Sequence, residues 1–160
     1  MKRVFHELEP IYNKNSKILI LGSFPSVKSR ENHFYYGHPQ NRFWRVLEHL
    51  FNVSLNDINV KKKFLYEHEI ALWDVIESCE IIGSSDASIT NVKINDIKRI
   101  LDETQITRIY VNGKKAEELY NKYVLKHTHI NCIVLPSTSP ANASYSLEKL
   151  IQKWEVITSM

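Results

Sequence analysis

The sequence lacks most features that mark a secreted, membrane-spanning or metal-binding protein. Its 160 residues hold only two cysteines, Cys79 and Cys132. These are too few for a disulfide framework or a four-thiolate cluster, and we expect each to be a small buried apolar residue. No apolar run approaches the roughly 20 residues that span a bilayer, and residues 1–7 lack the apolar core of a secretory signal. We therefore expect a cytoplasmic protein with no membrane partner.

Metal-ligand patterns, internal repeats and low-complexity segments are also absent from the sequence. The seven histidines are scattered, and no spacing of histidine, cysteine and carboxylate matches a zinc site, so we expect no metal and no cofactor. A formal net charge of +3 permits a polyanionic partner without requiring one. The chain length suits a single domain over residues 1–160.

Apolar runs that alternate with amphipathic segments predict the fold. Buried strands are expected at 18–21, 70–75, 106–111 and 132–135. Helices are expected at 41–51, 57–69, after 113 and at 147–154. Strands that alternate with helices imply right-handed crossovers between parallel strands. The predicted fold class is α/β, a three-layer α/β/α arrangement with a central, mostly parallel four-stranded sheet.

Weaker patterns suggest the remaining elements. The three-residue spacing of Phe5, Leu8 and Ile11 predicts a short amphipathic helix within residues 1–15. The other expectations are an inward-facing Val60 beside Phe64 and Leu65, an irregular segment at 78–88, and a helix whose inner face holds Ile94, Ile97 and Leu101.

Polar residues stand where each predicted strand ends. The loops after the four strands begin at Gly22, Asp74, Asn112 and Pro136. Parallel strands would deliver these loops to one rim, where ligands bind in open α/β sheets. The loop from Gly22 to Asn41 also combines tyrosines, histidines and a carboxamide. We therefore expect the functional site in the cleft between these loops.

Six segments of these loops match motifs of a known family. They are GSFPS at 22–26, YYGHPQNRFW at 35–44, LWDV at 72–75, GSSD at 83–86, NGK at 112–114 and LPSTSPAN at 135–142. In this order they resemble the uracil-DNA glycosylase superfamily, and most closely its sixth family, the hypoxanthine- or deoxyinosine-DNA glycosylases. The resemblance covers nearly the whole chain.

The resemblance implies a monofunctional enzyme of base excision repair. Such an enzyme flips a deaminated base, with hypoxanthine favoured, out of DNA and hydrolyses its N-glycosidic bond, leaving an abasic site. The implied partner is DNA containing deaminated bases, bound by a monomer that associates with the nucleoid through that DNA. The resemblance makes Asn41 the catalytic residue, because Phe24 occupies the place of the catalytic polar side chain of other branches.

The chemistry of N-glycosidic cleavage is compatible with a neutral catalytic residue. The sugar passes through an oxocarbenium-like state, which the DNA phosphates could stabilise. Asn41 would then only need to orient the attacking water by hydrogen bonds. The alternative is that Asn41 caps the helix that follows it.

The base must also be bound and read. By resemblance, Tyr36 stacks on the extruded base, unless it is a core tyrosine. Asp74, if ionised, would accept the N1–H of hypoxanthine and repel the bare N1 of adenine, unless it caps the next turn. Asp74 would accept the N3–H of uracil and the N1–H of guanine in the same way. By itself it therefore cannot select hypoxanthine over either base. The remaining expected base-pocket residues are Gly22, Ser23, Phe24, Pro25 and His38.

The last loop is expected to open the duplex. Its hydroxyls could donate to phosphates beside the lesion, and its tip could enter the gap left by the base. The expected DNA-binding residues are Ser137, Thr138, Ser139, Pro140, Ala141 and Asn142. An ordinary turn into the last helix is the alternative. Phosphate contacts could be added by Lys28, Arg30, Arg42 and Lys114.

Two other functions fit the same pocket. A uracil- or mismatch-directed glycosylase would use the same cleft, although the apolar Leu135 that opens the last motif argues against it. A catalytically weak nucleic-acid-binding module would keep the cleft for recognition alone, and the presence of Asn41 favours activity over this alternative.

Overall fold

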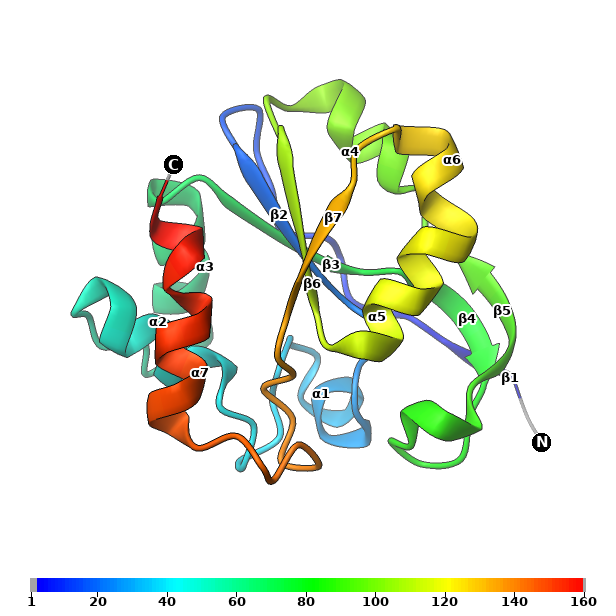
Figure 1. The fold of residues 1–160 in the computed structure, drawn as a ribbon, viewed down its shortest axis with the longest axis horizontal. Coiled ribbons are helices and arrows are strands. Elements are labelled where there is room, and N and C mark those ends of the chain that lie inside the picture. Colours follow the sequence, from blue (N-terminus) through cyan, green and yellow to red (C-terminus); the bar gives the residue numbers. More distant parts are fainter. Residues whose placement is uncertain (1–2, 160) are drawn as a thin grey trace.

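Four parallel strands form the centre of the molecule in the computed structural model, which describes residues 3–159 (Figure 1). Their order across the sheet is β3-β2-β6-β7. The bounds are β2 Ile18–Gly22, β3 Ile70–Asp74, β6 Arg108–Asn112 and β7 Cys132–Leu135. Every residue of β2 and β3 is buried, because helices cover both faces of these strands. The predicted sheet is therefore confirmed.

Helices form a layer on each side of the sheet (Figure 1). On one side lie α2 Phe43–Phe51, α3 Ile58–Glu67 and α7 Leu147–Trp154. On the other lie α4 Ile97–Glu103, α5 Lys114–Leu119 and α6 Leu125–Thr128, with a π-helical turn at Tyr120–Val124 joining the last two. The α/β/α prediction is confirmed, and a 3₁₀ turn, Glu155–Thr158, follows α7.

A second, antiparallel sheet lies beside the first and was not predicted. It has the order β1-β4-β5, with β1 Arg3–Phe5, β4 Ile76–Glu80 and β5 Thr90–Ile94. The expected helix in residues 1–15 is wrong for the described part of that segment, because Leu8 and Ile11 reach the core from extended chain and Phe5 stays exposed. Ile11 forms a backbone bridge with Leu72 instead.

The same sheet corrects two further expectations. The segment 78–88 begins inside strand β4 and contains a 3₁₀ turn at Asp86–Ser88. Ile94 ends strand β5, and its helix begins only at Ile97. In both places the backbone is extended because it pairs with a neighbouring strand of the sheet. The local periodicity of the sequence does not reveal such a pairing.

Several side chains also differ from expectation. Val60 is exposed, whereas Phe64 and Leu65 are buried as predicted. Cys79 is buried, but Cys132 is partly exposed on β7, the edge strand of the parallel sheet. The long first loop contains an unpredicted helix, α1 Val27–Asn32, which has no apolar face and starts at a Ser26 cap.

The carboxyl ends of the parallel strands lie at one edge of the sheet. Gly22 is paired in register with Asp74, and Asn112 with Leu135. In Figure 1 this edge is at the bottom, where α1 and the orange connection between β7 and α7 meet. The fold therefore brings the loops that carry the polar strand ends together, as the sequence predicts.

Candidate active site

A cavity of about 110 Å³ opens at this edge of the sheet. A buried water needs only about 10–15 Å³ of such space, so the cavity has room for more than one solvent molecule. All four strand ends contribute to its wall. The predicted residues that line it are Gly22, Ser23, Phe24, Pro25, Tyr36, Asn41, Asp74, Ser137, Thr138 and Ser139.

Gly22, Asp74 and Tyr36 form what we call the floor of the cavity. A methyl group placed on Gly22 would clash with Asp74 Oδ1 and lie 3.2 Å from the Tyr36 hydroxyl. Only glycine therefore lets the carboxylate and the phenol approach the strand end this closely. Asp74 is only 4% exposed, so the floor holds an acceptor in a nearly dry environment.

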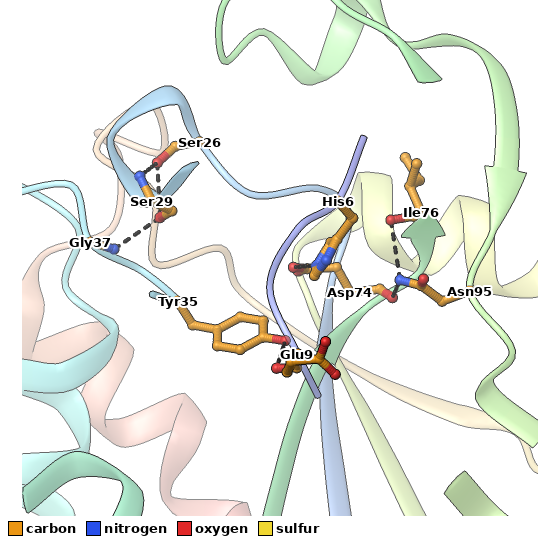
Figure 2. Close-up of polar contacts among 9 residues, drawn as sticks. All are labelled: His6, Glu9, Ser26, Ser29, Tyr35, Gly37, Asp74, Ile76 and Asn95. Carbon is orange, nitrogen blue, oxygen red and sulfur yellow. Dashed lines mark hydrogen bonds and ion pairs between the residues drawn. The ribbon is translucent and has the colours of Figure 1, made fainter. Parts of the chain in front are cut away.

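His6 holds the Asp74 carboxylate in place, a contact that the sequence did not reveal. His6 Nε2 lies 2.8 Å from Asp74 Oδ2, and both side chains are almost fully buried (Figure 2). Strand β1 delivers His6, and the His6 amide continues the pairing by donating to the Glu77 carbonyl at 2.7 Å. With Oδ2 engaged by His6, Oδ1 is the oxygen that lies over Gly22.

The backbone around Asp74 is fixed as well. The Asn95 amide donates to the carbonyls of Asp74 and Ile76 at 2.9 and 3.2 Å (Figure 2). The segment after His6 is tied down by the Tyr35 hydroxyl, which donates to the Glu9 carbonyl at 2.7 Å. These contacts leave the carboxylate little freedom to turn away from the cavity.

Tyr36 is held by its ring and leaves its hydroxyl without a partner. The ring stacks on Phe43 with centroids 4.0 Å apart, and the backbone has a left-handed φ of 54°. The hydroxyl is buried and makes no hydrogen bond. Burial and then the nearby Asp74 carboxylate raise the pKa of Tyr36 well above its ordinary value. The neighbouring Asn112 side chain, which forms no hydrogen bond of acceptable geometry with the hydroxyl, offsets a small part of this rise in pKa. The phenol therefore keeps its proton at neutral pH and is a donor.

Asn41 lies at the rim of the cavity, just before helix α2. Its Oδ1 accepts the Phe43 amide proton at 2.9 Å, a local turn at the helix start. The N-cap residue of α2 is Arg42, whose side chain does not cap the helix. The contact of Asn41 is therefore a turn just before the helix, not the helix cap considered from the sequence. It uses one lone pair of a carboxamide oxygen that has two, and Asn41 still lines the cavity.

The loop between β7 and α7 is held by two residues at its base. Asn112 donates to the Thr138 hydroxyl and accepts the Thr138 amide proton, each at 3.0 Å. Arg42 donates to the carbonyls of Ser139 and Asn142 at 3.0 and 3.1 Å and also to that of Tyr145. The Arg42 guanidinium thus binds this loop, and the structure corrects its expected phosphate contact.

Two other expected site residues are held by contacts within the protein. Thr138 is completely buried, and its hydroxyl and amide anchor the loop to Asn112. His38 does not line the cavity; its Nδ1 accepts the Gln40 amide proton at 3.0 Å within a local turn. Ser137 and Ser139 remain partly exposed at the rim.

The tip of the loop faces a second, wider groove next to the cavity. Ala141 and Asn142 line this groove of about 680 Å³, together with Ser137 and Ser139, which belong to both. Pro140 lies between them and is partly exposed. The expected DNA-binding segment is thus continuous from the cavity into the groove.

Asp86, the last residue of the GSSD motif, also contributes to the cavity. Its carboxylate accepts the Ser23 hydroxyl at 2.8 Å at the mouth of the cavity. Partial desolvation there raises the pKa of Asp86, and the hydrogen bond from Ser23 offsets part of this rise. Its place in the GSSD motif was the available signal, whereas His6 had none, because its partner stands 68 positions away.

No metal-binding group stands out in this region. Within residues 3–159, three or more histidine, cysteine, aspartate or glutamate side chains do not gather in a way that could hold an ion. In the same part of the chain, no helix has the length and apolarity needed to cross a membrane.

Comparison with known proteins gives concordant results. Residues 9–158 match the model of the uracil DNA glycosylase superfamily. The hypoxanthine DNA glycosylase of Methanosarcina acetivorans is 36% identical over 92% of this chain and 93% of its own length. That of Methanosarcina barkeri is 35% identical over 83% of this chain and 85% of its own.

A solved structure shares the fold. The solution NMR structure of a Methanosarcina acetivorans protein, provisionally designated a uracil DNA glycosylase, superposes with a TM-score of 0.79 at 36% identity. The match covers 93% of this chain and 92% of the other. The family model, the relatives and the shared architecture together place the chain in the uracil DNA glycosylase superfamily.

Proposed function

We propose that this chain is a DNA glycosylase that excises hypoxanthine from DNA and leaves an abasic site. One observation carries the proposal: a single cavity joins a carboxamide at its rim, Asn41, to a buried carboxylate at its floor, Asp74. The two relatives named hypoxanthine DNA glycosylase support the choice of base.

Asn41 is proposed to orient the attacking water. The free lone pair of Oδ1 accepts a hydrogen bond from the water, which directs the water oxygen toward C1′ of the extruded nucleotide. The C1′–O bond forms as the C1′–N9 bond breaks, the base leaves with the bonding electron pair, and the proton that the water loses ends on the departing base. The apolar Phe24 offers no alternative water ligand in the first motif, which supports this role.

The floor is proposed to bind the extruded base. The Tyr36 ring, which stacks on Phe43, would lie at the edge of the base rather than on its face, and Asp74 Oδ1 would accept the ring N1–H of the base. Burial of Asp74 strengthens this interaction and makes a bare ring nitrogen at the same place costly. Gly22, Ser23, Phe24 and Pro25 complete the wall around the base.

Ser137, Ser139 and the tip from Pro140 to Asn142 are proposed to contact the opened strand. The rim hydroxyls can donate to phosphates, and the groove beyond them continues the path. Residues of one chain line the whole cavity, which supports a monomer. Cytoplasmic DNA of the nucleoid is then the proposed place of action.

A strand-nicking assay tests the proposal. Duplexes that carry hypoxanthine, uracil or xanthine are incubated with excess protein and treated with alkali, which cleaves at abasic sites. Cleavage at hypoxanthine that disappears with Asn41→Ala is expected. DNA binding with no cleavage at any of the three bases would instead support the nucleic-acid-binding module, and a preference for uracil would support the uracil-directed alternative.

A further inference from the structure

The Tyr36 hydroxyl is a buried polar group that the mechanism above leaves unused. Four side-chain polar atoms in residues 3–159 are buried without a hydrogen bond, on Arg30, Tyr36, Arg42 and Trp73. Tyr36 is the one of these residues that lines the cavity. Buried polar groups in proteins almost always have a partner, so an unpaired phenol in a cavity wall points to a ligand.

The hydroxyl stands beside the carboxylate oxygen that faces the cavity. Both the Tyr36 hydroxyl and Asp74 Oδ1 lie against the same point above Gly22. His6 occupies the other carboxylate oxygen, and Phe43 supports the Tyr36 ring. The floor therefore presents a fixed donor next to a fixed acceptor.

Deamination changes the edge of a base in a way that this pair can read. Adenine has an unprotonated ring N1 beside an amino group, an acceptor followed by a donor. Hypoxanthine has N1–H beside a carbonyl oxygen, a donor followed by an acceptor. Cytosine and uracil are related in the same manner at N3. With the carboxylate opposite the ring nitrogen, this pair can make both hydrogen bonds to the deaminated form, whereas the parent base would place a bare ring nitrogen against the carboxylate.

We propose that the Tyr36 hydroxyl donates to the carbonyl oxygen of the extruded base while Asp74 Oδ1 accepts its ring N–H. The substrate class is then a base with a lactam edge, such as hypoxanthine, xanthine or uracil. This inference rests on the proposed function and assigns Tyr36 as a specificity-determining residue. Guanine carries the same edge, so its exclusion depends on its 2-amino group meeting another part of the wall.

Tyr36→Phe removes the hydroxyl and keeps the ring on Phe43. Single-turnover excision is measured on duplexes that carry hypoxanthine or unsubstituted purine, which lacks the carbonyl oxygen and also the N1–H that Asp74 would bind. Excision of hypoxanthine is expected to fall roughly five- to tenfold and that of purine to change by less than about twofold. Because the lost hydroxyl is unpaired, the melting temperature is expected to stay or rise.

Tyr35→Phe is the matched control. Tyr35 lines the same cavity, but its hydroxyl is bound to the Glu9 carbonyl. This variant is expected to lower the melting temperature and leave the ratio of hypoxanthine to purine excision unchanged. If Tyr36→Phe leaves the ratio of hypoxanthine to purine excision unchanged, the inference is overturned. The hydroxyl would then serve packing or bind a water.

A binding measurement separates this inference from the proposed function. Asn41→Ala and Asn41→Ala/Tyr36→Phe are titrated with the two duplexes by fluorescence anisotropy. A preference for hypoxanthine over purine that the second substitution lowers about five- to tenfold supports the reading role, even where the wild-type protein cleaves nothing; that absence of cleavage would overturn the glycosylase proposal alone. Equal affinities for the two duplexes in both variants overturn the reading role.

Discussion

The floor and the rim of the cavity are built in different ways. At the floor, His6 binds Asp74 from 68 positions away, and both side chains are buried. At the rim, Asn41 is held through Phe43, two positions along the chain, and is partly exposed. Ser137 is similar, because its hydroxyl accepts the Ser139 amide proton at 3.1 Å. The floor depends on tertiary contacts and the rim on local turns.

This difference fits two separate tasks. Reading a ring edge requires donors and acceptors that are dry and cannot turn to suit the wrong base. Admitting a sugar, a water and phosphates requires accessible groups on loops, which a rigid scaffold only has to place. Substitutions at the rim should therefore change rate or affinity with small effects on base choice. Substitutions at the floor should change base choice, stability or both.

The largest expected effect is at the rim. Asn41→Ala should lower single-turnover excision of hypoxanthine at least about 100-fold, because the water loses its orienting group. Loss of the turn to Phe43 should lower the free energy of unfolding by only about 1 kcal/mol. Excision is measured by strand nicking and stability by urea denaturation.

Asn41→Ser separates the two roles. A serine hydroxyl can still accept the Phe43 amide proton, so stability should return while excision stays low. Recovery of excision together with stability would show that Asn41 acts only through its turn with the Phe43 amide.

The next effect is at the floor. In Asp74→Asn, the Nε2–H of His6 should draw the amide oxygen and leave the amide NH₂ toward the base. That group repels the N1–H of hypoxanthine and can donate to a bare N1, so excision of hypoxanthine should fall about 10- to 100-fold. The ratio of hypoxanthine to purine excision should fall with it. An unchanged ratio would remove Asp74 from base reading.

His6→Leu should mainly affect stability. Asp74 would lose the hydrogen bond that accompanies its burial, and the free energy of unfolding should fall by about 1.5–3 kcal/mol. Excision of hypoxanthine should fall several-fold, since the carboxylate can then rotate. His6→Gln keeps an N–H donor and should restore most of both properties. Equal stability of wild type and His6→Leu would contradict the contact.

The smallest expected effect is again at the rim. Ser139→Ala should weaken binding to duplex DNA about two- to fivefold, the size of one neutral hydrogen bond to a phosphate. Ser54→Ala is the control, because Ser54 is exposed beyond the far end of α2. Affinity that falls equally in both variants, measured by anisotropy at fixed salt, would exclude a specific contact.

Local patterns predicted side chains at the rim and also the three floor residues, Gly22, Tyr36 and Asp74. The carboxamide of Asn41 and the hydroxyls of Ser137 and Ser139 lie within short motifs whose turns form between near neighbours. Local patterns do not report that Asn112, at the end of another strand, binds Thr138. The His38 ring is used in its own turn.

The sequence by itself determined the parallel sheet and the edge at which the site lies. Apolar runs of strand length must be buried on both faces, and parallel strands place all their carboxyl ends together. Tertiary structure alone decided the second sheet, the place of His6 on Asp74 and the unpaired hydroxyl of Tyr36 over Gly22. Periodicity and motif spacing describe neighbours in the chain, whereas these features depend on a strand register and a packing contact between distant segments.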